Sequence, residues 1–226
     1  MALRNKVNLY QDRGNVRTSA PAVEPVTADE LRTHIRGLTS TMLPDAEADD
    51  LIQEARELIE ESIGVALITQ TWTLSLDNWP LGEERFTEGF STGSVADLYA
   101  RPSTVELPRY PLQSIDSVTT YDEDGDSTAV TVASVFDVDT AQVPGRMRLK
   151  VGQVWPSALR GTNAIEVSYV SGYGDAASDV PAALKRAVKQ LAAYLYSQRG
   201  DACDVSDALI SSGAAAILDR YKVVRV

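Results

Sequence analysis

Residues 165–201 read IEVSYVSGYGDAASDVPAALKRAVKQLAAYLYSQRGD. Apolar and polar residues alternate from Ile165 to Tyr169, which is the period of a half-buried strand. Gly172 and Gly174 interrupt this pattern, because glycine tolerates the positive φ of a turn. We therefore predict a strand that ends at these two glycines.

The rest of this stretch predicts a long amphipathic helix over residues 181–199. Asp179 can cap it, and Pro181 suits its first turn, where the missing N–H of proline costs nothing. One side of the helix is apolar at Leu184, Val188, Leu191 and Leu195. The other side carries Lys185, Arg186 and Lys189. We interpret this basic side, in a chain that is acidic overall, as a surface for a protein partner.

Length and composition fit one globular domain, alone or with extensions. The chain has 226 residues, of which 44% are hydrophobic, an ordinary fraction for a protein with an apolar core. Apolar runs are far shorter than the roughly 20 residues that span a bilayer, and residues 1–20 lack a signal-peptide core. We therefore expect no membrane partner. The single cysteine, Cys203, suits a reducing compartment.

The formal net charge of −11 disfavours nonspecific binding to nucleic acid. Such binding depends on Lys and Arg, which displace counterions from phosphates. A repulsive surface is nevertheless compatible with DNA that slides past the protein.

Two helices are predicted in the first third of the chain, after an N-terminal arm over residues 1–26. The arm mixes basic residues with prolines and lacks an apolar period. Thr27 and Glu30 have the spacing of a capping box, which opens a helix over residues 27–36. A second helix is predicted over residues 46–63, with Gly64 at its end.

This second helix is strongly acidic, with Arg56 as its only basic residue. One interpretation is a solvated acidic face. The other pairs this face with the basic side of the 181–199 helix, either within a subunit or between subunits. The acidic residues proposed for such an interface are Asp50, Glu54, Glu57 and Glu61.

The remaining pattern predicts an α+β fold in which helices bracket a β-rich insert over residues 66–172. Within the insert, residues 122–126 predict a hairpin turn, and residues 82–103 form a long loop. A last helix is predicted over residues 205–218. The basic and apolar tail consists of Arg220, Tyr221, Lys222, Val223, Val224, Arg225 and Val226.

Motifs for catalysis or metal binding are weak. Ser91 lies in a G-x-S-x-G pattern, but a hydrolase would need a histidine downstream, and the only histidine, His34, lies upstream. Asp201 and Asp204 lie close to Cys203 in the sequence and would raise the pKa of its thiol. We therefore expect no enzyme and no cofactor.

Three further patterns favour structural roles. Asp122, Asp124 and Asp126 resemble the start of a calcium loop, but Gly125 falls at the wrong position, so we predict a turn and no metal. The row Arg146, Arg148 and Lys150 could meet phosphate or pair with neighbouring acids. The tryptophans are expected in core or edge packing: Trp72, Trp79 and Trp155.

Read in order, several segments resemble the head–tail connector (adaptor) family of tailed bacteriophages and gene transfer agents. They span roughly residues 26–200 and comprise 26–36, 51–64, 67–74, 107–112, 121–125 and 169–199. The loop 82–103 looks longer than the usual link in this family, and the arm 1–26 is extra.

The resemblance implies a ring of this chain, commonly of twelve subunits, under the portal protein at the capsid vertex. Such a ring extends the conduit for double-stranded DNA, without sequence recognition, and offers a surface to the stopper or tail. It also implies that residues 220–226 reach the portal. The location would be the virion neck, after assembly in the bacterial cytoplasm.

Two other functions stay open from the sequence. A tail or surface module could use the loop 82–103 to engage a receptor or glycan. A hydrolase could use Ser91. Heterologous contacts in a ring require two different complementary faces on each subunit, and the acidic and basic helices offer such a pair.

Overall fold

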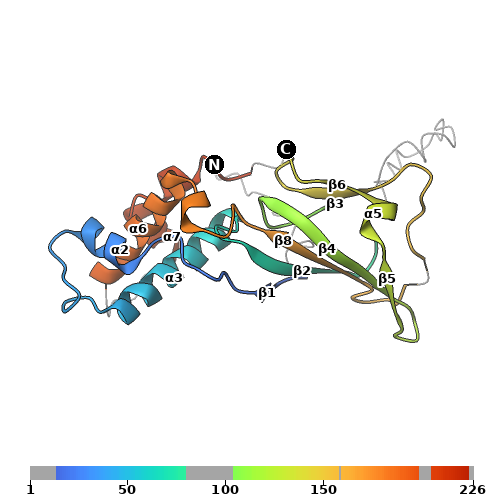
Figure 1. The fold of residues 1–226 in the computed structure, drawn as a ribbon, viewed down its shortest axis with the longest axis horizontal. Helices are drawn as coiled ribbons and strands as arrows, with labels where there is room; N and C mark the ends of the chain where they lie inside the picture. Colours follow the sequence, from blue (N-terminus) through green and yellow to red (C-terminus); the bar gives the residue numbers. More distant parts are fainter. Residues whose placement is uncertain (1–13, 80–103, 158, 199–204, 224–226) are drawn as a thin grey trace. The chain divides into compact units, whose positions relative to one another are not determined.

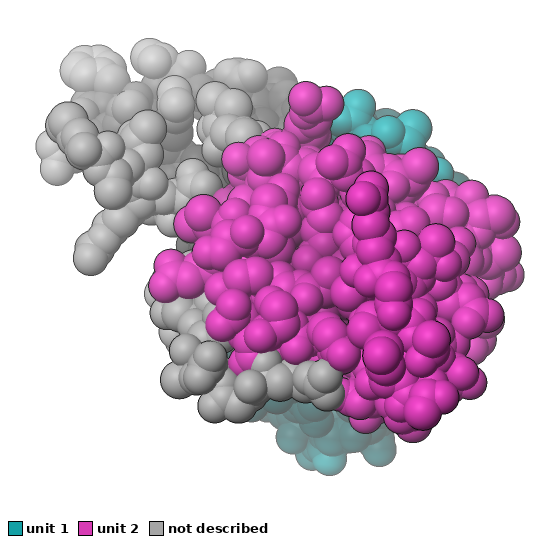
Figure 2. Space-filling view, turned by 90° about the vertical axis from the view of Figure 1, so that its left-hand side faces the viewer, with its two compact units in different colours: residues 1–19, 71–170 teal, residues 20–70, 171–226 magenta. Residues whose placement is uncertain are grey.

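The computed structural model describes residues 14–79, 104–157, 159–198 and 205–223, and for Val205 and Ser206 it describes the backbone alone. The chain divides into two compact units, each built from two stretches of sequence. We call residues 1–19 and 71–170 the β-rich unit, and residues 20–70 and 171–226 the helical unit. Figure 1 shows the fold, and in Figure 2 the helical unit presents one continuous surface. The predicted α+β fold is confirmed.

The β-rich unit contains a five-stranded and a three-stranded sheet. The first has the order β1-β2-β8-β4-β5, and the second has the order β3-β7-β6. The strands are β1 (Asn15–Ser19), β2 (Gln70–Leu76), β3 (Thr104–Glu106), β4 (Leu112–Tyr121), β5 (Ser127–Val130), β6 (Phe136–Asp139), β7 (Arg146–Leu149) and β8 (Ile165–Ser171). The short helix α5 (Val132–Val135) precedes β6.

Both sheets of this unit contribute to one apolar core. Trp79 stacks on Trp155 with ring centroids 4.4 Å apart, and Phe136 lies 5.8 Å from Trp79. The indole N–H of Trp79 donates to the carbonyl oxygen of Pro156 at 3.0 Å. Trp72 is also buried. The prediction of core or edge packing for the tryptophans is therefore confirmed: Trp72 and Trp79 belong to the core, and partly buried Trp155 packs against it.

The helical unit packs α3 (Asp45–Ile63) against α6 (Ala182–Ser197), and α2 (Ala28–Ile35) contacts both. The short helices α7 (Val205–Ser211) and α8 (Ala215–Leu218) pack on α6. The predicted capping box is present, because Thr27 and Glu30 bond reciprocally to each other's backbone N–H. Gly64 ends α3 in the left-handed conformation, as predicted.

The strand and turn predicted before α6 are confirmed. Buried and half-buried residues alternate along β8, and Gly172 follows it with φ 147°. A Cβ at Gly172 would lie 2.6 Å from the carbonyl carbon of Ile68. This close approach of two backbones is the physical reason for glycine at that position.

Three local features differ from the sequence expectation. Residues 15–19, expected in an arm, form β1 because they pair antiparallel with β2. The predicted helix 205–218 is two short helices, interrupted near Gly213 at φ 77°. Asp179 does not cap α6: it ends the 3-10 helix η1 (Ala177–Asp179), and its carboxylate accepts from the N–H of Ala176.

Candidate functional site

The outer face of α3 carries the acidic residues that the sequence analysis proposed. At about 100° per residue, Asp50, Glu54, Glu57 and Glu61 fall within one narrow sector of the helix. We call these four residues the acidic stripe. They line a shallow groove of about 320 Å³ together with Gln53 and Leu58. The buried residues occupy the opposite side of the helix: Ala48, Ile52, Ala55, Ile59 and Ile63.

The four carboxylates of the acidic stripe differ in their partners. The Glu57 carboxylate lies 3.5 Å from the guanidinium of Arg56 and accepts from the Gln53 amide at 3.4 Å. The carboxylates of Asp50, Glu54 and Glu61 form no ion pair within the part of the chain that the structure describes. Three negative charges of the stripe are therefore uncompensated in the isolated subunit.

The basic residues of α6 form a second surface, which we call the basic stripe: Lys185, Arg186 and Lys189. Lys185 and Lys189 are half-buried, and Arg186 is exposed. Among the residues described, none of the three makes an ion pair or hydrogen bond. The buried side of α6 consists of Leu184, Ala187, Val188, Leu191 and Ala192.

The structure therefore answers one half of the pairing hypothesis. α3 and α6 pack on each other in the helical unit, yet no ion pair between described residues links the acidic stripe to the basic stripe. The buried side of each helix consists of its apolar residues, and both sets of charges lie elsewhere on the helix surface. Pairing within a subunit is absent among these residues, and pairing between subunits stays a prediction.

His34, in the last turn of α2, lies within electrostatic reach of the basic stripe. Partial burial lowers the pKa of its imidazole below the usual 6.5, and the positive charges of Lys189 and Arg186 lower it further. No acidic group contributes to this shift. His34 is thus a neutral neighbour of the basic stripe at pH 7 and a further cation in acid.

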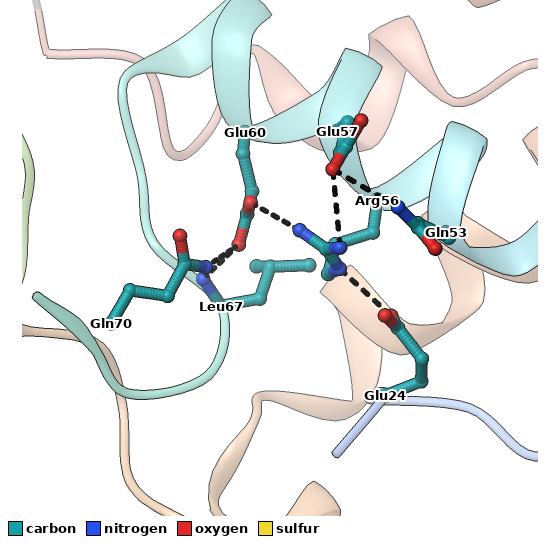
Figure 3. A network of polar contacts seen from close by, with 7 residues as sticks. All are labelled: Glu24, Gln53, Arg56, Glu57, Glu60, Leu67 and Gln70. Atoms are coloured by element: carbon teal, nitrogen blue, oxygen red, sulfur yellow. Dashed lines mark hydrogen bonds and ion pairs between the residues drawn. The ribbon is translucent and has the colours of Figure 1, made fainter. Parts of the chain in front are cut away.

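A buried network of polar side chains lies on the flank of α3 (Figure 3). The guanidinium of Arg56, 2% exposed, donates to the Glu24 carboxylate at 2.8 Å and to the Glu60 carboxylate at 2.9 Å. Glu60 also accepts from the backbone N–H of Leu67 and from the amide of Gln70, both at 2.7 Å.

Burial raises the pKa of the Glu60 carboxyl above the usual 4.5, and the charge of Arg56 and the hydrogen bonds from Leu67, Arg56 and Gln70 oppose this rise. The network joins the segment before α2, the helix α3 and the segment after it. In the sequence Arg56 is the one basic residue of an acidic helix, and its burial was not predicted. The i,i+4 spacing of Arg56 and Glu60 was the available signal.

Two residues of the basic row, Arg146 in β7 and Lys150 directly after it, are paired with neighbouring acids. The guanidinium of Arg146 lies 3.0 Å from the Asp139 carboxylate, and the ammonium of Lys150 lies 4.0 Å from that of Asp137. Arg148 stands opposite Asp137 in the register of β6 and β7. The second of the two sequence interpretations, pairing with acids, therefore describes Arg146 and Lys150, while Arg148 forms no ion pair with a described residue.

The hairpin between β4 and β5 is a turn, as predicted. The Asp122 carboxylate accepts from the backbone N–H groups of Asp124 at 3.1 Å and Asp126 at 2.8 Å. Within the described ranges, no group of acidic, histidine or cysteine side chains could hold a metal ion. Ser91 with its loop 82–103, the arm residues 1–13, and Cys203 lie outside the described residues.

The proposed tail is described only at its start. Arg220, Tyr221 and Lys222 continue from α8 through backbone hydrogen bonds to Ile217 and Leu218. Arg220 and Lys222 are exposed, and Val224, Arg225 and Val226 lie outside the described residues. None of the described helices is both long enough and apolar enough to cross a membrane.

Three solved structures share this fold over nearly the whole chain. The first is described as the virion of a native gene transfer agent particle, with a TM-score of 0.70, 23% identity and coverage of 94% of this chain and 96% of that chain. The second is described as the neck of an empty gene transfer agent particle computed with C6 symmetry, with a TM-score of 0.68, 22% identity and coverage of 94% and 96%.

The third is described as the neck of a native gene transfer agent particle computed with C12 symmetry. Its TM-score is 0.63, its identity 22%, and the match covers 93% of this chain and 97% of that chain. No family model matches the sequence, and no curated protein matches it significantly. At these identities, the likeness shows a common fold.

Proposed function

We propose that this chain is a structural protein of the neck of a phage-like particle, where it forms a ring. The observation that carries the proposal is the shared fold over 94% of the chain with chains of gene transfer agent particles. Two of those structures are necks computed with C6 or C12 symmetry, which is compatible with twelve copies around one axis. The order of the segments along the chain, which resembles that of the head–tail connector (adaptor) family, supports the same function.

In a ring, the two charged stripes can contact each other across the interface between neighbouring subunits. Each interface of a cyclic ring joins two different faces of the same subunit. The basic stripe and three of the four carboxylates of the acidic stripe have no ion pair with a described residue, and we propose that the two stripes, which are opposite in charge, meet between neighbouring copies. Charge pairs of this kind mainly set register and specificity, and apolar burial supplies most of the affinity.

The remaining contacts of the proposed ring follow from the adaptor role. The tail, residues 220–226, contacts the portal protein, and the opposite side of the ring receives the stopper or tail-completion protein. Double-stranded DNA passes through without sequence recognition, since a chain of net charge −11 repels phosphate. The protein has no catalytic role, is assembled in the bacterial cytoplasm and resides in the virion neck.

Location in the particle tests this function. The chain is fitted into a cryo-EM map of the particle that its gene cluster encodes, and ring density between the portal and the tail is expected. A matched particle that lacks the gene should show no such ring and no attached tail. Density at a tail fibre or on the capsid surface would contradict the proposal and would favour a receptor-binding or glycan-binding module.

A further inference from the structure

Each charged helix places part of its charge near the end where its own dipole opposes that charge. A helix carries partial negative charge at its C-terminus and partial positive charge at its N-terminus. The last turn of α3 contains acidic residues and no basic one. Lys185, Arg186 and Lys189 lie in the first half of α6, whose first turn contains no acidic residue. Each arrangement is unfavourable in the isolated subunit.

Repulsion between like charges adds to this cost along α3. Glu57 and Glu61 are four residues apart, and Glu54 and Glu57 are three apart, which makes them neighbours on the helix surface. A fold that accepts such local conflicts commonly does so at a functional surface. The conflict in α3 would be relieved by cations, and the conflict in α6 would be relieved by anions.

Within the acidic stripe, Glu54 and Glu61 are better placed to pair with a partner than Asp50 and Glu57. Glu57 is already held by Arg56 and Gln53. Asp50 lies in the first half of α3, away from the negative end of the helix dipole. Glu54 and Glu61 remain, exposed and without an ion pair to any described residue.

We propose that the first half of α6 of one copy docks on the second half of α3 of the next copy, where Lys185 and Lys189 pair with Glu54 and Glu61. This inference rests on the ring of the proposed function and names its contact. The opposed helix ends then face each other, so the dipole of each helix favours the charges of its neighbour. Asp50 and Glu57 are bystanders in this contact.

The spacing of the residues suits this pairing. Glu54 and Glu61 are about 10 Å apart along the helix, and Lys185 and Lys189 about 6 Å. The flexible four-carbon stems of the lysines span the difference. Half-buried Leu58 lies between the two carboxylates and lines the same groove, where it offers an apolar contact to the incoming helix.

Charge reversal with rescue tests the pairing. The variants are E54K/E61K, K185E/K189E and the combination of all four changes, each co-expressed with the portal protein, and the ring is measured by mass photometry. Each double variant should lower the fraction of ring about tenfold or more, and the combination should restore most of it, because opposite charges again face each other.

A second readout separates assembly from folding. E54K/E61K should raise the thermal midpoint of the dissociated subunit, since it removes repulsion along α3 and places one cation, at position 61, in the last turn of the helix. Ring stability and subunit stability therefore move in opposite directions. A variant that merely misfolds would lower both, and the proposal would then be judged on E54Q/E61Q, which should weaken the ring with no loss of subunit stability.

Two matched control variants should form the ring as the wild type does. D50K changes the same stripe on the same helix, and E123K/D124K makes an equal change of net charge on the β4–β5 hairpin. If all the charge-reversed variants form the ring as the wild type does, the pairing is wrong. The same holds if D50K loses as much ring as E54K/E61K. Neither result would contradict the proposed ring. A wild-type chain that forms no ring with the portal protein would overturn the proposed function as well.

Discussion

In the β-rich unit, exposed Arg146 is paired with Asp139 on the adjacent strand, and the core around Trp79 is aromatic. In the helical unit the arrangement is reversed: Arg56 and Glu60 are buried in an ionic network, while the acidic and basic stripes on the surface are largely unpaired. Charges that the subunit compensates itself serve its own fold. Charges that it leaves uncompensated are the ones to examine for a partner.

The largest expected effect in this comparison comes from the buried network. Arg56→Ala leaves the buried Glu60 carboxylate without its cation, and we expect a loss of about 3–5 kcal/mol in the free energy of unfolding. Urea denaturation of the dissociated subunit measures this loss. Glu54→Ala, on the outer side of the same helix, is the control and should cost nothing. Equal losses for the two variants would refute the distinction between inner and outer charges.

The aromatic core of the β-rich unit should give a somewhat smaller effect. Trp79→Ala removes the stacking on Trp155 and the hydrogen bond to Pro156, and we expect a loss of about 3 kcal/mol. The same denaturation experiment measures it. Because no ionised group is involved, the loss should be the same at pH 5 and pH 8, and a strong pH dependence would count against an apolar origin.

Substitutions of surface charges should have different effects in the two units. Arg146→Ala breaks an exposed pair, and we expect a cost of about 0–1 kcal/mol to the subunit. Lys185→Ala should cost the subunit no stability and should weaken the ring. Native mass spectrometry and thermal unfolding of both variants test this, and weaker ring assembly in Arg146→Ala than in Lys185→Ala would reverse the assignment.

The smallest expected effect belongs to His34. Its pKa lies below 6.5 in the folded chain, so the unfolded chain binds more protons between the folded pKa and 6.5. The free energy of unfolding therefore falls as the pH drops through that window. In His34→Gln this part of the pH dependence should disappear, as urea titrations of both proteins at a series of pH values would reveal. Parallel pH profiles of the two proteins would contradict this account.

Local chemistry made much of the fold predictable. The Thr27 capping box, the end of α3 at Gly64 and the strand–turn–helix order around Gly172 depend on neighbours in sequence, so their patterns predicted them. β1 was missed because its hydrogen bonds go to β2, more than fifty residues away. The break between α7 and α8 was missed because a single glycine can be tolerated within a helix or can end it.

The candidate site was predictable in its residues and not in its partners. Helical periodicity alone placed Glu54 and Glu61 on one side of α3, and Lys185 and Lys189 outside the apolar side of α6. It could not distinguish Glu57, which Arg56 holds, from its neighbours. That distinction depends on side-chain geometry.

The sequence by itself determined where charge lies on each helix, because a helix repeats every 3.6 residues whatever packs against it. Only the tertiary structure decided which charges are buried and paired. Arg56 is held by Glu24 and Glu60, and Glu60 in turn by Leu67 and Gln70, and Glu24 and the segment after α3 reach the network only when the chain folds. Burial of a charge requires such partners, since an ion without them is costly to remove from water.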